Sequence, residues 1–162
     1  MELFLGRSWR LHDDTDVEIL RGDVSQVAEL IGDWDLHVAA NGELTPWDGS
    51  EPSAEQDQNN LWCRRAPEAP WCLDITISDG DSSRWIYRRD PKVSLEWSAA
   101  VLTSPDGVDF LAPEIQLLFK SKNVRTKDSI DAHEVIPGLD LERRNWLTGH
   151  LSPAHPWQEL LH

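Results

Sequence analysis

Carboxylates crowd one short stretch near the start of this chain. Asp13, Asp14, Asp16 and Glu18 fall within six positions, and residues 17–20 have the composition of a strand. Because alternate side chains of a strand share a face, Asp14, Asp16 and Glu18 should point one way and the apolar residues the other. Like charges on one face repel one another, and a hard cation such as Mg²⁺ prefers carboxylate oxygens. The stretch predicts either a divalent-metal site or a solvated turn before a strand.

A second strand, predicted over residues 71–77, carries Asp74 in its middle. Alternation places Asp74 opposite a face that comprises Trp71, Leu73, Ile75 and Ile77. A lone carboxylate in mid-strand is costly unless it is paired, hydrated or bound to a metal. A turn and another strand, 84–88, come next, so we expect Asp74 to lie on a hairpin with that strand.

A third candidate group is basic and lies downstream. It comprises Lys120, Lys122, Arg125 and Lys127. These residues either bind phosphate or satisfy the dipoles of helix ends, and we expect Asp128 and Asp131 to pair with them. Carboxylates that hold magnesium, together with basic groups on a polyphosphate, are what phosphoryl or nucleotidyl transfer requires.

The composition restricts the class of partner. The 162 residues include 29 acidic and 15 basic side chains, and the net charge is -14. Nucleic acid polymers and anionic membranes are therefore disfavoured, whereas a cationic small molecule or a metal–nucleotide complex is a natural guest. Two cysteines without metal-ligand spacing, and no apolar run of membrane length, favour the cytoplasm. Four of the nine tryptophans, Trp34, Trp62, Trp71 and Trp85, are expected in the core unless one stacks on a nucleobase.

The order of elements, strands first and helices last, predicts an α+β domain. We expect a core over residues 1–111 and a C-terminal helical segment, 112–162, packed on the same domain. Within the core, residues 24–31 should form a helix, and Asn41-Gly42 should form the turn of a hairpin.

At this point the sequence resembles a known family. The segment Leu5-Gly6-Arg7, followed by Arg10 and His12-Asp13-Asp14-Thr15-Asp16, is similar to the Gly-Arg…Arg-x-His-x-Asp-x-Asp block of small-molecule nucleotidyltransferases of the DNA polymerase β superfamily. The minimal aminoglycoside and lincosamide nucleotidyltransferases carry this block. Leu73-Asp74 is similar to their third acidic strand. Residues 112–120, with Lys122, Arg125, Lys127, Asp128 and Asp131, are similar to the downstream helices of their relatives.

The resemblance implies a nucleotidyltransferase-like mixed sheet flanked by helices. Asp14 and Asp16 would hold two Mg²⁺ ions, one of which arrives with ATP or another nucleoside triphosphate. Asp74 would either complete the second metal site or act as base toward the acceptor hydroxyl. The basic residues Lys120, Lys122, Arg125 and Lys127 would bind the nucleotide. The reaction implied is transfer of AMP from ATP to a hydroxyl of a small, cationic acceptor of the aminoglycoside or lincosamide type.

One departure from the family pattern opens an alternative. The family's Gly-Gly or Gly-Ser turn, which binds phosphate through backbone N–H groups, would fall before Met1. Either the chain starts late, or it has lost this phosphate contact. The alternative function is therefore a catalytically inactive protein of the same fold that acts as a ligand-binding or protein-interaction module, such as an antitoxin. A third interpretation is an unrelated acidic α+β protein whose carboxylates are simply solvated.

Overall fold

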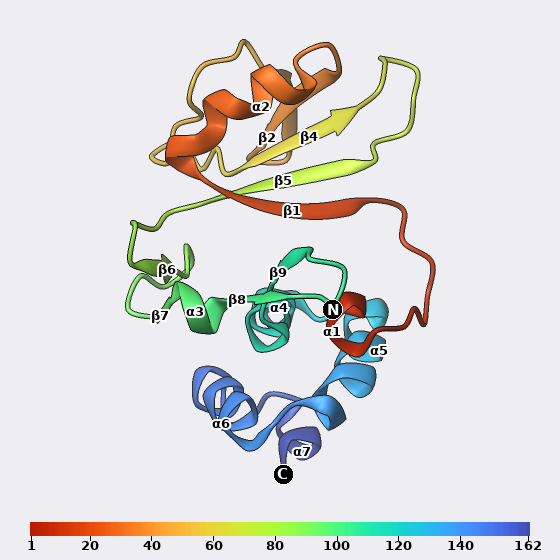
Figure 1. The fold of residues 1–162 in the computed structure, drawn as a ribbon, viewed down its shortest axis with the longest axis vertical. Helices are drawn as coiled ribbons and strands as arrows, with labels where there is room; N and C mark the ends of the chain where they lie inside the picture. Colours follow the sequence, from red (N-terminus) through yellow and green to blue (C-terminus); the bar gives the residue numbers. More distant parts are fainter. The chain divides into compact units, whose positions relative to one another are not determined.

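The computed structural model describes residues 1–162, which form two compact units. The sheet unit comprises Arg10–Glu96, and the helical unit combines Met1–Trp9 with Trp97–His162 (Figure 1). The core predicted over 1–111 therefore contributes residues to both units, whereas the predicted helical segment 112–162 lies wholly in the helical unit. A mixed sheet together with several helices confirms the coarse α+β expectation.

The sheet unit is built on five strands in the order β1-β5-β4-β2-β3. Their bounds are β1 (Thr15–Leu20), β2 (Asp35–Ala40), β3 (Glu43–Pro46), β4 (Asn60–Arg64) and β5 (Leu73–Ser78). The β1 and β5 strands run parallel, and every other neighbouring pair is antiparallel. Asn41 and Gly42 both have positive φ between β2 and β3, as the predicted hairpin turn requires.

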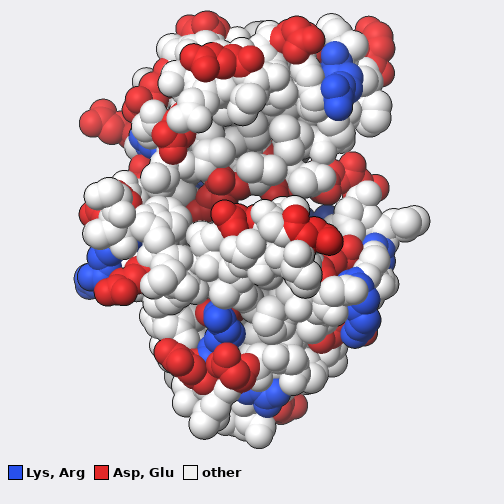
Figure 2. Space-filling view, viewed as in Figure 1, with Lys and Arg blue, Asp and Glu red and all other residues white.

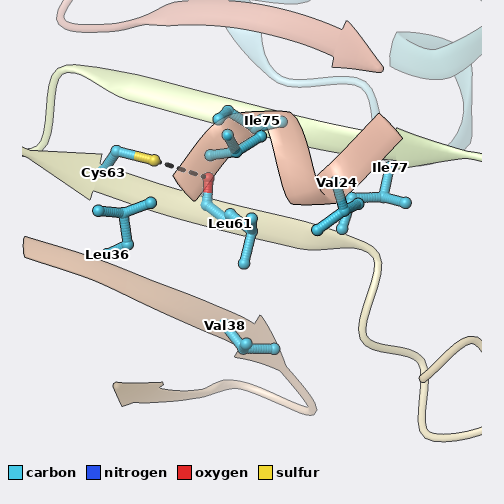
Figure 3. Packing of buried hydrophobic residues seen from close by; sticks show 8 residues of the cluster. Val24, Leu36, Val38, Leu61, Cys63, Ile75 and Ile77 are labelled. Atoms are coloured by element: carbon cyan, nitrogen blue, oxygen red, sulfur yellow. Dashed lines mark hydrogen bonds between the residues drawn. The ribbon is translucent and has the colours of Figure 1, made fainter. Parts of the chain in front are cut away.

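One face of this sheet is apolar because each strand alternates. Helix α2 (Val24–Ile31) follows a short 3₁₀ turn, η1 (Arg21–Asp23), and contributes Val24 and Val27 to the core. The sheet contributes the remaining core members, Leu36, Val38, Leu61, Cys63, Ile75 and Ile77 (Figure 3). The helix predicted over 24–31 is confirmed.

The opposite face carries the residues that alternate with these core residues along the strands, including Asp16, Asp74, Asn60 and Trp62. Trp71 was expected with the core residues of its strand, and this prediction is wrong. Trp71 precedes β5, and its ring contacts His37 and Trp62, which belong to the polar face. Alternation holds only within a paired strand, so it does not extend to a residue two positions before β5.

The predicted hairpin between the strand of Asp74 and residues 84–88 does not form. Strand β5 pairs with β1 and β4, whereas β6 (Arg84–Ile86) pairs with β7 (Ser94–Glu96) in a separate sheet. Ile75 and Ile77 are almost fully buried, and an interior strand with neighbours on both sides achieves this burial. Asp74 therefore lies in the interior of the main sheet.

Arg21 joins the ends of three segments of the sheet unit. Its guanidinium donates to the Asp79 carboxylate (2.8 Å), the Pro52 carbonyl (2.8 Å) and the Asn59 side-chain carbonyl (2.7 Å). Arg21 follows β1, Asp79 follows β5 and Asn59 precedes β4. These charge-assisted hydrogen bonds hold together one end each of β1, β5 and β4, the strands that surround the candidate site.

The helical unit contains short strands as well as helices. Its elements are α1 (Glu2–Leu5), α3 (Trp97–Ala100), β8 (Val101–Thr103), β9 (Asp109–Leu111), α4 (Pro113–Lys120), η2 (Ser121–Asn123), α5 (Thr126–Val135), η3 (Ile136–Gly138), α6 (Leu141–His150) and α7 (Gln158–Leu161). Pro113 and Glu114 lie in the first turn of α4, which suits a residue without an N–H and an acid at the positive helix end. None of the helices has both the length and the apolar character needed to cross a bilayer.

Two buried aspartates on α5 organise the junction between α4 and α5. Asp128 and Asp131 are almost completely buried, and Lys120 reaches both, at 3.5 and 3.2 Å. The Nε–H of Arg125 donates a hydrogen bond to the Asp128 carboxylate at 2.8 Å. The backbone N–H of Arg125 donates to the same carboxylate at 2.9 Å. The predicted pairing of Asp128 and Asp131 with the basic cluster is confirmed. Burial alone would raise the pKa of Asp128, but the hydrogen bonds from Arg125 and the charge of Lys120 lower it to about 2.

These contacts predict an acid-labile contribution to stability. The pKa of Asp128 is about 2 in the folded protein, against an ordinary value of 3.8. The ionised group therefore stabilises the protein above about pH 4, and this contribution disappears as the pH falls toward 2. Asp128→Asn should lower the free energy of unfolding at neutral pH by about 2 kcal/mol. Urea unfolding measures the free energy of unfolding of both proteins at pH 7 and near pH 2.

The matched control is Asp106→Asn, which removes an exposed carboxylate from the turn between β8 and β9. This variant should unfold like the unchanged protein at both pH values. An equal loss of stability at pH 7 and near pH 2 in Asp128→Asn would contradict the role assigned to the charge.

Candidate functional site: three carboxylates on two parallel strands

Asp16 and Asp74 are direct neighbours in the parallel pair formed by β1 and β5. The register pairs Thr15 with Leu73 and Asp16 with Asp74. Paired residues of adjacent strands point to the same face, and the strands lie about 4.8 Å apart. Asp14 stands one residue before β1. The sheet therefore pairs two of the three aspartates that the sequence singled out, and the third stands just before β1.

Asp74 is the most sheltered of the three. The side-chain amide of Asn60 donates to Asp74 Oδ1 at 2.8 Å and to Thr76 Oγ1 at 3.2 Å. Burial raises the pKa of Asp74, and the charges of Asp16 and then Asp14 raise it further. The Asn60 amide opposes the rise, and the indole N–H of Trp62 makes a smaller contribution in the same direction. The carboxyl thus binds a proton more readily than an ordinary aspartate.

Asp14 and Asp16 are both exposed. The ion pairs within the sheet unit involve Asp35 and Asp79, and none of them includes Asp14, Asp16 or Asp74. No ion pair within the sheet unit therefore joins a lysine or arginine to these carboxylates. No group of three or more His, Cys, Asp or Glu side chains is arranged as a metal-binding set. The three aspartates are neighbours with hard oxygen donors, the donor type that Mg²⁺ prefers.

Glu18, the fourth acid of the stretch, has a structural role. Its carboxylate accepts hydrogen bonds from the Ser78 hydroxyl and from the Trp85 indole N–H, the latter at 2.7 Å. Burial raises the pKa of Glu18, and the two donors and the charge of Arg88 oppose this rise. Glu18 is therefore engaged by residues of the sheet unit, which separates it from the exposed Asp14 and Asp16.

The basic residues expected at the site all belong to the helical unit. Lys120 ends α4, and Arg125 directly precedes α5, where both are bound to buried aspartates. Lys122 and Lys127 are exposed. Acidic side chains outnumber basic ones over the surface visible in Figure 2. Lys122 and Lys127 are consequently the members of the cluster that can best contact an incoming anion.

Sequence reasoning missed Asn60 and expected Trp62 in the core, but both lie beside Asp74. Asn60 and Trp62 lie on β4, at positions that pair with Thr76 and Asp74 of β5. Their alternation with the buried residues Leu61 and Cys63 could have placed them on the polar face. The pairing of β4 with β5 joins segments separated by a turn of eight residues, and only this register brings the Asn60 amide to Asp74.

The geometry predicts how each neighbour acts on the Asp74 carboxyl. Asp16→Asn should lower the pKa of Asp74, because of the two nearby negative charges that of Asp16 has the larger effect on this pKa. Asp14→Asn should lower it less. Asn60→Leu should raise it, because the amide donor is lost. Carbon-detected NMR titration of the aspartate carboxyl groups measures all three shifts.

Glu29→Gln is the matched control for these titrations. It also removes one exposed negative charge, but from α2, which covers the apolar face of the sheet. The pKa of Asp74 should stay unchanged in this variant. If Asp16→Asn and Glu29→Gln had the same effect, the pairing of Asp16 with Asp74 would be contradicted.

Comparison with known proteins adds no relative to this description. No family model matches the chain, and neither the curated proteins nor the solved structures contain a match. The function must therefore be inferred from the chain's own residues, chiefly the carboxylates that β1 and β5 hold side by side.

Proposed function

We propose that this chain is a metal-dependent nucleotidyltransferase that moves a nucleoside monophosphate, AMP from ATP, onto a hydroxyl of a small molecule. The observation that carries the proposal is the register of β1 and β5, which pairs Asp16 with Asp74 and leaves Asp14 next to them. The resemblance of the opening and closing sequence blocks supports the same function. A nucleotidyltransferase-like arrangement of the mixed sheet is part of the proposal.

Asp14, Asp16 and Asp74 carry carboxylate oxygens, the donor type that the Mg²⁺ of this chemistry needs. Asp14 and Asp16 would hold two Mg²⁺ ions, and Asp74 would either complete the second site or accept the proton of the acceptor hydroxyl. The ions would polarise the α-phosphate and stabilise the charge on the leaving pyrophosphate. Asn60 holds one oxygen of Asp74, which orients the carboxylate for either role. Burial and the charges of Asp16 and Asp14 raise the pKa of Asp74, which makes its carboxylate a stronger proton acceptor than an ordinary aspartate.

The basic cluster supports binding of a triphosphate. Lys122 and Lys127 are exposed, and Lys120 and Arg125 are held in place by Asp128 and Asp131. Cations so fixed contribute to phosphate binding at little cost in side-chain entropy. We therefore propose that this cluster of the helical unit binds phosphate, with Lys122 and Lys127 as the direct contacts.

The acidic composition favours a cationic acceptor. The net charge of -14 attracts ammonium groups, and the exposed Asp14 and Asp16 concentrate this charge on the polar face of the sheet. Aminoglycosides and lincosamides combine hydroxyl groups with positive charge, and they are the acceptor type that we propose.

The test begins with binding and continues with transfer. Calorimetric titration with Mg-ATP should give saturable heat, and mass spectrometry should detect an adenylylated product with a panel of aminoglycosides and lincosamides. Asp16→Asn should reduce transfer by about 100-fold or more, because it removes a metal ligand. Glu29→Gln, which removes an exposed carboxylate from α2, should transfer at the unchanged rate.

Each result separates the possible functions. Transfer that persists in Asp16→Asn would overturn the metal assignment. Saturable binding of Mg-ATP without any product would favour the non-catalytic module of the same fold. A wild-type chain that neither binds Mg-ATP nor forms product would overturn the nucleotidyltransferase proposal.

A further inference from the structure

A single row of residues crosses the polar face of the sheet at the level of the carboxylates. The registers pair Asp16 of β1 with Asp74 of β5, Asp74 with Trp62 of β4, and Trp62 with His37 of β2. In-register residues share a face. Trp62 is therefore the next side chain beyond Asp74, on the side away from Asp14 and Asp16.

Trp62 is exceptional among the nine tryptophans. It is 37% exposed, and each of the other eight is buried or half-buried. A tryptophan in the interior of a strand normally buries its large apolar surface, so its exposure beside a sheltered carboxyl needs a reason. Figure 3 shows the opposite, core-facing side of the same strand, where Leu61 and Cys63 pack.

The ring of Trp71 packs against the ring of Trp62 from one side. The ring of Trp71 meets it at 6.0 Å between centroids in an edge-to-face arrangement, and His37 meets Trp71 in the same way at 5.3 Å. An aromatic side chain packed in this way can bind a ligand without losing much conformational entropy.

The rings of two other tryptophans of the sheet unit each contact an arginine side chain. The guanidinium of Arg64 lies over Trp71 at 4.3 Å from the ring centroid, and that of Arg65 lies over Trp34 at 3.9 Å. Trp62 is the exposed tryptophan of the group, and no arginine or lysine covers its ring. Its electron-rich face is thus open to a cation or to the C–H groups of a ring from outside.

We propose that Trp62 forms the wall of the acceptor subsite and binds the face of a saturated, ammonium-bearing ring, such as that of an amino sugar, beside Asp74. The proposal rests on the nucleotidyltransferase function proposed above. Asp74 separates Trp62 from Asp14 and Asp16, where the metal–nucleotide complex would bind, so Trp62 lies on the acceptor side. The ring's ammonium groups face carboxylates, and its C–H face meets the indole.

The experiment measures ring binding directly, apart from catalysis. Calorimetry with kanamycin as the cationic probe is run in about 0.3 M salt, which screens the general attraction of an acidic protein for cations. Trp62→Ala should weaken kanamycin binding about tenfold, and Trp62→Phe, which keeps an aromatic face, should weaken it no more than about threefold. Maltotriose, which has saturated rings without ammonium groups, should bind much more weakly than kanamycin to the unchanged protein.

Leu30→Ala is the control variant, because Leu30 is 80% exposed on α2, which covers the other face of the sheet. Its kanamycin affinity should be unchanged, and thermal unfolding should show that every variant folds. In a chain active in transfer, Trp62→Ala should raise the KM for kanamycin about tenfold. The affinity for Mg-ATP should stay the same.

Three results would overturn the assignment. They are unchanged kanamycin binding in Trp62→Ala, no kanamycin binding by the unchanged protein, and a loss of Mg-ATP affinity in Trp62→Ala, which would place the nucleobase on this ring. If the protein binds kanamycin through Trp62 but transfers nucleotide to no member of the acceptor panel, the ring site stands and the proposed nucleotidyltransferase function fails.

Discussion

The parallel pairing of β1 with β5 is the constraint on which the candidate site depends. It places Asp16 beside Asp74 and so brings like charges together on one face of the sheet. This arrangement opposes folding, and donors from β4 reduce its cost, with Asn60 bound to Asp74. A shift of the register by one residue would turn Asp16 toward the apolar core, so the buried face specifies the polar one. The site and the core are thus two consequences of the same strand pairing.

The apolar face supplies the stability that allows this concentration of charge. Val24 and Val27 of α2 pack against buried residues of β2, β4 and β5. Arg21 adds charge-assisted hydrogen bonds that join the segments after β1 and β5 to the one before β4. The apolar core and Arg21 therefore stabilise the strands whose other face carries the candidate site. Asp14, Asp16 and Trp62 remain exposed and can bind a ligand. Glu18 instead accepts a hydrogen bond from Ser78 and has a structural role.

Local sequence signals predicted the parts of the fold that depend on neighbouring residues. The helix over 24–31, the hairpin turn at Asn41-Gly42 and the pairing of Asp128 with the nearby cations all arise within a few positions of the chain. Predictions that needed a distant partner were less successful. The strand of Asp74 was expected to pair with residues 84–88, but its neighbours are β1, almost sixty residues earlier, and β4.

The sequence by itself determined which side chains share a face of each strand, because alternation is a property of the extended backbone. Alternation singled out Asp14, Asp16 and Asp74 as carboxylates opposite an apolar face, and the family resemblance implied that they share one site. Only the tertiary structure decided that β5 lies between β1 and β4, which sets Asp16 on one side of Asp74 and Trp62 on the other. The physical reason is that strand order and register minimise the exposure of the whole apolar face, and no short segment contains that information.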